Sequence, residues 1–134
     1  MTDYIKLNAG DFASMRGKRK VEEATVYVRD TGRFEFNYVA VERLGTNVSL
    51  CAEKSSRNCF AVMRNGGDFE LSYQGGRRMA FYCAPLAKHV IEKTWERDVH
   101  AADAKKPQSM TFVIASLPVD DGENKDVFAL IRKK

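Results

Sequence analysis

The stretch Asp30-Thr31-Gly32-Arg33-Phe34-Glu35-Phe36 combines a chain reversal with the start of a strand. Gly accepts a positive φ and Asp bonds its own backbone, so Asp30–Arg33 can form a tight turn. Phe34 and Phe36 then alternate with charged residues, which is typical of a strand with one buried face. Residues 25–28, before the turn, place Val26 and Val28 on one face. Together these residues predict a β-hairpin.

The segment after this hairpin predicts a short helix and a second hairpin. Asn37 can cap a helix over residues 38–44, and Gly45 can end it in a left-handed conformation. Strands are expected over 48–52 and 59–63, before the turn residues Asn65-Gly66-Gly67. Residues 24–66 therefore predict a strand–strand–helix–strand–strand unit.

The second half of the chain repeats this order. Strands are expected over 69–73, 79–82, 110–115 and 126–131, with a helix over about 84–97. Pro85 suits the first turn of that helix, and an apolar stripe follows at helical spacing. The stripe consists of Leu86, Val90, Ile91 and Trp95.

The two halves can be aligned by placing Arg33–Phe36 on Arg78–Phe81. We therefore expect an α+β, mainly β fold, in which two strand–strand–helix–strand–strand repeats form one pseudo-twofold swapped-hairpin-like barrel. The expected organisation is a single domain over 1–134, with a preamble (1–23) and two repeats (24–66 and 67–134). The alternative is that any α+β chain with hairpins would show a similar order.

The strand and helix periods also predict the core. The residues expected to form most of it are Phe34, Phe36, Leu44, Leu50, Phe69, Leu71, Phe81, Leu86, Ile91, Phe112 and Ile114.

Composition is typical of one globular domain inside the cell. The 134 residues are 44% hydrophobic and 30% charged. The N-terminus lacks an apolar signal core, and no apolar run is long enough to span a bilayer. The odd set Cys51, Cys59 and Cys83 fits a reducing compartment and small, partly buried thiols. A cytoplasmic protein without metal or cofactor is expected.

Three segments carry a family resemblance: Asp30–Phe36, Val41-Glu42-Arg43-Leu44-Gly45 and Val48-Ser49-Leu50. They resemble the AbrB-type swapped-hairpin domain, although Asn37 stands where those domains commonly have proline. Such domains dimerise by exchanging hairpins, and many are bacterial transcription regulators or antitoxins. The resemblance implies DNA binding, with two copies forming an intramolecular pseudo-dimer. The chain would then be a monomer or a homodimer.

Basic residues are the candidates for contacting nucleic acid. The resemblance implies contacts by position from Arg29, Arg33 and Arg43 in the first half, and from Arg77, Arg78 and Lys88 in the second. The basic run Arg16, Lys18, Arg19 and Lys20 could grip nucleic acid as an arm. The net charge of +4 and pI of about 9.0 permit an anionic partner without requiring one. The acidic neighbours Asp30, Glu35, Glu42 and Glu70 oppose this reading and favour a solvated, mixed-charge surface.

Catalysis has little support in the sequence. Cys83 and His89 could act as nucleophile and base, but no orienting acid or oxyanion site can be named. Residues 120–124 lack the spacing of a calcium loop, and Gly75-Gly76-Arg77 lacks that of a phosphate loop. The sequence therefore predicts a small non-enzymatic nucleic-acid-binding or transcription-regulatory domain. The alternative is a protein-interaction module of a phage or mobile element that acts on a host protein.

Overall fold

The computed structural model describes residues 23–76 and 78–133. The first half contains β1 (Thr25–Arg29), β2 (Arg33–Phe36), α2 (Tyr38–Leu44), β3 (Asn47–Ala52) and β4 (Phe60–Arg64). The second contains β5 (Phe69–Glu70), β6 (Ser72–Gly75), β7 (Arg78–Tyr82), α3 (Ala84–Arg97), β8 (Ser109–Ile114) and β9 (Val127–Lys133). The protein is therefore mainly β, as predicted.

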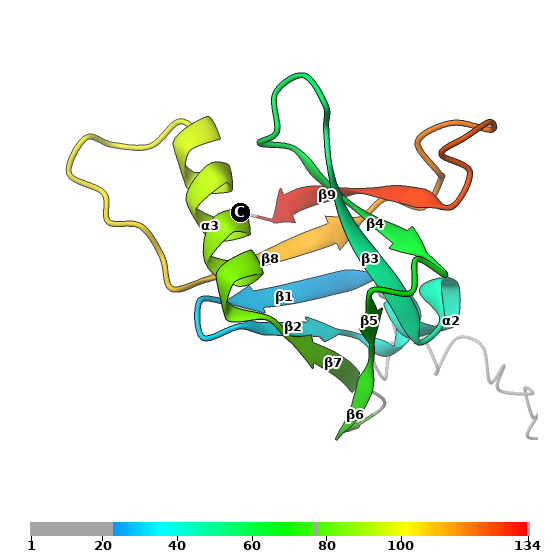
Figure 1. Cartoon of the computed structure of the whole chain (residues 1–134). Helices are drawn as coiled ribbons and strands as arrows, with labels where there is room; N and C mark the ends of the chain where they lie inside the picture. Colours follow the sequence, from blue (N-terminus) through cyan, green and yellow to red (C-terminus); the bar gives the residue numbers. More distant parts are fainter. Residues whose placement is uncertain (1–22, 77, 134) are drawn as a thin grey trace, which may run out of the picture.

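All nine strands belong to one antiparallel sheet that curls into a nearly closed barrel (Figure 1). The strand order is β5-β3-β4-β9-β8-β1-β2-β7-β6. β5 and β6, at the two ends of this order, are consecutive in the chain and separated only by Leu71. One bent segment thus pairs with β3 on one side and with β7 on the other. The helices lie at opposite ends of the barrel, with α3 on the left of Figure 1 and α2 on the right.

Four of the strand ladders join the two halves of the chain. β2 pairs with β7, and β4 pairs with β9. β1 pairs with β8, while β3 pairs with β5. Each half therefore supplies strands to the other rather than forming a sheet of its own.

Aromatic residues form the centre of the core. The ring of Phe81 stacks on Phe34 at 4.5 Å between centroids and on Phe69 at 4.1 Å. The even-numbered residues of β1 and β2 point inward, because side chains alternate between the faces of a strand. The sequence prediction of buried Phe34, Phe36, Leu44, Leu71, Phe81, Ile91, Phe112 and Ile114 is confirmed.

Asn37 connects the first strand to the first helix. Its Oδ1 accepts hydrogen bonds from the amides of Ala40 (3.0 Å) and Thr25 (3.1 Å), and its Nδ2 donates to the carbonyl oxygen of Glu23. The predicted helix cap is confirmed, and the same side chain holds the start of β1 in place. Gly45 ends α2 with a φ of 74°.

Three sequence predictions about buried faces were wrong or incomplete. The predicted strand over 69–73 is broken at Leu71, and Tyr73, in β6 beyond this break, is 71% exposed. Leu50, Phe69 and Leu86 are only partly buried. The buried side of α3 consists of Ala87, Val90, Ile91 and Thr94, whereas Leu86 and Trp95 lie at its margin.

Candidate nucleic-acid interface

Two of the predicted arginines meet at one carboxylate on the outer face of β2 and β7. Nη2 of Arg33 lies 2.6 Å from Oε1 of Glu35, and Nη1 of Arg78 lies 3.7 Å from the same oxygen. Arg33 pairs in the ladder with Tyr82, and Glu35 pairs with Ala80. Because side chains alternate along a strand, these residues face away from the stacked phenylalanines of the core. We call Arg33, Glu35, Arg78 and Tyr82 the hairpin face.

The electrostatics of the hairpin face are mixed. The side chain of Glu35 is 13% exposed, against 33% for Arg33 and 55% for Arg78. One carboxylate therefore faces two guanidinium groups, which leaves a net positive charge. Tyr82 is 59% exposed beside them. Guanidinium groups bind phosphate and exposed aromatic rings stack on bases, so this face has the two elements of a nucleic-acid contact.

Of the other predicted binding residues that the structure describes, Arg43 and Lys88 lie on the two helices, whereas Arg29 comes opposite Arg33 in the register of β1 and β2. Nη1 of Arg43 donates to the carbonyl oxygens of Ile114 (3.2 Å) and Ala115 (3.1 Å). Arg29 is exposed at the end of β1, and Lys88 is exposed on α3. Arg43 therefore joins the last turn of α2 to the end of β8. The predicted contacts Arg77, Arg16, Lys18, Arg19 and Lys20 lie outside the described residues.

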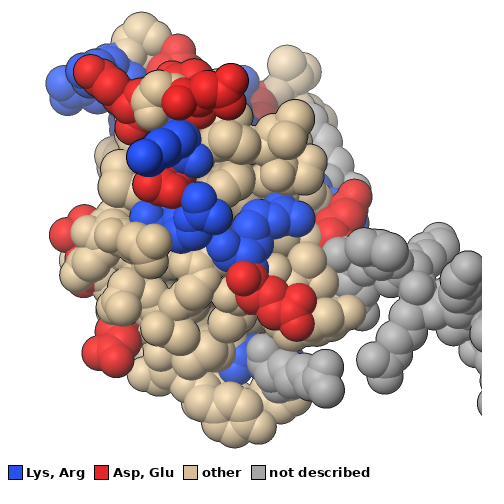
Figure 2. Space-filling view, turned by 90° about the vertical axis from the view of Figure 1, so that its right-hand side faces the viewer, with Lys and Arg blue, Asp and Glu red and all other residues tan. Residues whose placement is uncertain are grey.

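Charge is balanced over the described part of the chain. In residues 23–76 and 78–133, Asp and Glu are as numerous as Lys and Arg, so the net charge of +4 comes from the remaining residues. On the face shown in Figure 2, basic side chains gather near the middle with acidic ones on several sides. Any binding of a polyanion by the described residues must therefore depend on local arrangement rather than on overall charge.

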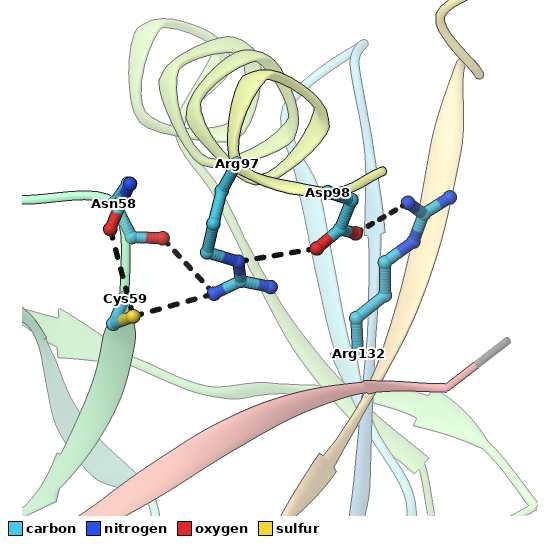
Figure 3. Close-up of polar contacts among 5 residues, drawn as sticks. All are labelled: Asn58, Cys59, Arg97, Asp98 and Arg132. Carbon is cyan, nitrogen blue, oxygen red and sulfur yellow. Dashed lines mark hydrogen bonds and ion pairs between the residues drawn. The ribbon is translucent and has the colours of Figure 1, made fainter. Parts of the chain in front are cut away.

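A second polar cluster, not predicted from the sequence, lies at the end of α3 (Figure 3). Asp98 accepts hydrogen bonds from Nε of Arg97 (3.2 Å) and from Nη1 of Arg132 on β9 (2.7 Å). Nη1 of Arg97 also donates to the carbonyl oxygen of Asn58 (3.1 Å) and contacts Sγ of Cys59 (3.6 Å). The cluster ties the helix end to β9 and to the start of β4.

Asp98 is the carboxylate on which this cluster depends. Its side chain is 11% exposed. Burial raises the pKa of Asp98, but the hydrogen bonds from Arg132 and Arg97 outweigh this effect, and the pKa lies below its ordinary value. Nearby, the Trp95 ring stacks on His100 at 3.7 Å, and the Arg132 guanidinium lies 5.9 Å from the Trp95 ring centroid. The cluster is best explained as an anchor for the end of α3.

The candidate catalytic groups Cys83 and His89 lie in different surroundings. Cys83 occupies the cap position before α3, whereas His89 packs edge-on against Phe60 at 5.9 Å between ring centroids. All three cysteines are free and partly buried, as predicted. Burial, reinforced by the charge of Asp68, raises the pKa of the Cys51 thiol and disfavours its nucleophilic form. Within the described ranges, no group of three or more His, Cys, Asp or Glu side chains could hold a metal ion.

Neither helix of the described residues combines the length and apolar character needed to cross a membrane. Comparisons with known proteins add no family: no family model matches the chain, and no curated protein or solved structure matches it significantly.

Proposed function

We propose that this protein is a non-enzymatic, cytoplasmic nucleic-acid-binding domain with a regulatory role, built as a duplicated swapped hairpin. The observation that carries the proposal is the convergence of Arg33 and Arg78 on Glu35. These arginines come from the two halves and are equivalent in the sequence alignment. A duplicated unit would therefore present one arginine from each repeat to the same ligand.

The register of the β2–β7 ladder supports the duplication. The alignment of Arg33–Phe36 with Arg78–Phe81 makes Glu35 equivalent to Ala80. If a twofold axis passes through an antiparallel ladder, the residue nearest the axis pairs with the equivalent residue of the other repeat. The residue before it then pairs with the one that follows that equivalent, and the reverse holds on the other side. Glu35 does pair with Ala80, Phe34 with Phe81 and Phe36 with Met79. This is the register that a pseudo-twofold axis requires.

A separate pair of ladders supports the same axis. In the β4–β9 ladder, Val62 pairs with Phe128. If the axis passes through this pair, the two residues are equivalent, and the same offset along the chain makes Thr46 equivalent to Phe112. The first alignment makes Val26 equivalent to Leu71. Val26 pairs with Phe112, so the twofold predicts that Leu71 lies beside Thr46. The amide of Leu71 donates to the carbonyl oxygen of Thr46 at 2.8 Å.

The pattern of pairing also supports hairpin exchange. The β3–β4 hairpin of the first half pairs with β5 and β9, and the β8–β9 hairpin of the second half pairs with β1 and β4. Each closing hairpin thus lies against the other half. Such an exchange within one chain corresponds to the pseudo-dimer, which could act as a monomer or assemble into a homodimer.

The test is titration of the full chain with random duplex and single-stranded DNA at low salt. Affinity should fall with salt, and Arg33→Ala and Arg78→Ala should each lower the log–log salt slope by about 0.9 on duplex DNA. Lys106→Ala removes the same charge from an exposed loop residue and should change little. Absence of binding at protein concentrations of about 100 μM would rule out general nucleic-acid contact by this face.

A protein-interaction module is the second candidate. The balanced charge of the described residues favours it, as do exposed apolar residues outside the barrel. Leu117 is 75% exposed and Val119 is 55% exposed in the segment between β8 and β9. An apolar protein interface depends weakly on salt, whereas phosphate contacts weaken steeply as salt rises. The salt dependence of binding to any isolated partner therefore separates the two candidates.

A further inference from the structure

An open groove lies between α3 and the turn that joins β3 to β4. Its volume is about 470 Å³, and its lining consists of Ala52, Ser56, Arg57, Asn58, His89, Lys93 and Glu96. This lining shares no residue with the hairpin face. The volume falls in the range of small-molecule sites, about 300–1,000 Å³.

The two walls of the groove are held to each other. Asn58, on the strand side, accepts a hydrogen bond through its carbonyl oxygen from Arg97 at the end of α3 (Figure 3). Arg97 is held in turn by Asp98, which also binds Arg132. On the helix side, the ring of His89 packs edge-on against Phe60 of β4. The walls of the groove are thus braced at the helix end and along the helix, so they need little rearrangement when a ligand enters.

The nitrogen groups of the lining outnumber its carboxylates. Arg57, His89 and Lys93 carry nitrogen groups able to donate to an anion, and Glu96 is the one acidic residue of the lining. Lys93 lies 3.4 Å from Glu96, but both side chains are exposed, at 41% and 55%. An exposed pair of this kind contributes little, so Lys93 can exchange Glu96 for a ligand. Arg57 occupies a left-handed conformation (φ 56°), and its amide donates to the carbonyl oxygen of Glu53, which fixes the turn.

We propose that this groove binds a small phosphate monoester of about mononucleotide size. Arg57 would bind the phosphate oxygens through its planar fork, Lys93 would supply a second charge, and His89 would donate a further hydrogen bond. Ser56 and Asn58 offer neutral polar groups for the remainder of the ligand. The proposal is separate from the hairpin face and does not depend on nucleic-acid binding there.

The experiment is an NMR titration of the isotope-labelled full chain with AMP, and with adenosine as the matched ligand without phosphate. AMP should shift the resonances of Arg57, His89 and Lys93 in a saturable way, with a Kd of about 1 mM or tighter. Adenosine should shift them far less. Oligonucleotides with and without a 5′-phosphate form a second arm. The 5′-phosphorylated oligonucleotide could be preferred over the unphosphorylated one by the same factor by which AMP is preferred over adenosine. That result would show that a strand end occupies the groove, and would overturn the small-molecule assignment.

The variants Arg57→Ala and Lys93→Ala should each weaken AMP binding about tenfold, since each loses a charge-assisted contact. Both positions lie on the groove surface and not in the core, so the melting temperature should stay unchanged and exclude unfolding as the cause. Lys106→Ala is the charge-matched control and should bind as the parent does. Unsaturated shifts at about 10 mM AMP, or undiminished binding by the double variant, would overturn the proposal.

Discussion

Arg43 and Arg97 perform the same task at opposite ends of the barrel. Each is in the last turn of its helix, and each donates a hydrogen bond to backbone carbonyl oxygen of the other half of the chain. Arg43 reaches Ile114 and Ala115, whereas Arg97 reaches Asn58. Arg43 thereby joins the end of α2 to the end of β8, and Arg97 joins the end of α3 to the loop before β4.

Loss of either tie should reduce stability. Arg43→Ala removes two hydrogen bonds to carbonyl oxygens and should cost about 1–3 kcal/mol in the free energy of unfolding. Urea unfolding measures this cost. Lys88→Ala removes an exposed cation from α3 and should stay within about 0.5 kcal/mol of the parent. Equal stability of the Arg43 variant and the parent would show that the side chain is free to act elsewhere, as the family resemblance implies.

The Asp98 cluster should make stability depend on acidity. Because the folded pKa of Asp98 is lowered, its contribution is present above the unfolded pKa of about 3.9 and is lost as the pH falls through the folded value. Asp98→Asn should therefore cost about 2–3 kcal/mol at pH 7, and the difference from the parent should shrink below pH of about 4. Denaturation curves across pH test this. Asp103→Asn, in the exposed loop, is the control and should leave stability close to that of the parent at pH 7. A constant gap between Asp98→Asn and the parent across pH would contradict the assignment.

The stacked phenylalanines should dominate the stability of the core. Phe81→Ala removes the middle ring of the stack with Phe34 and Phe69, and should cost about 3–5 kcal/mol. Tyr82→Ala, one residue further along β7, removes an exposed ring and should cost far less. Thermal melting of the two variants compares them directly. Similar losses for both would mean that the faces of β7 are assigned the wrong way round.

Gly66 should tolerate no side chain. A Cβ at this position would meet Oγ of Ser49 and would lie 2.7 Å from the backbone nitrogen of that residue. Gly66→Ala must therefore displace β3 and should cost about 1–3 kcal/mol or more. Gly122→Ala is the matched control, because its Cβ would come no closer than 3.6 Å to Asp120 Oδ1. Chemical denaturation should separate the two variants, and equal stability would argue against the close approach of β3 to the turn.

Glu35 should restrain nucleic-acid binding by the hairpin face. Glu35→Gln removes the negative charge that Arg33 and Arg78 share, so affinity should rise about two- to fivefold at low salt. Binding titrations at several salt concentrations measure the effect, with Glu92→Gln on the exposed side of α3 as the control. Weaker binding by Glu35→Gln would mean that the carboxylate positions the arginines rather than competing for them.

Local sequence chemistry predicted most of the elements, because turns and alternating strands depend on neighbouring residues. The cap at Asn37, the end of α2 at Gly45 and the extent of α3 all followed from short-range patterns. The break at Leu71 did not, because it depends on barrel closure, in which one segment must reach two different strands. The burial of Thr94 instead of Trp95 also depends on tertiary structure. The side of α3 that is buried is determined by how the helix packs over the end of the barrel, which the spacing of apolar residues in the helix does not predict.

The candidate site was predicted only in part. Glu35 lies two residues from Arg33, so the alternation of side chains along a strand predicts that both lie on one face. The alignment of the two halves makes Arg78 equivalent to Arg33 and so adds it to the predicted site. The contacts of Arg43, and of Asp98 with Arg132, join residues far apart in the chain and leave no spacing signal. The prediction that Arg43 contacts nucleic acid comes from the family resemblance, and no local pattern indicates its hydrogen bonds to Ile114 and Ala115.

The pairing of strands between the two halves of the chain also determines when the protein can fold during synthesis. β1 obtains its second neighbour only when β8 is made, because Thr25 pairs with Val113. Until then, the nascent first half carries an unpaired strand edge and an apolar face that its own residues cannot cover. Such edges promote association between chains. The ribosome must therefore release β9 before the barrel can close, and folding should be slow because many of the pairings are between distant residues.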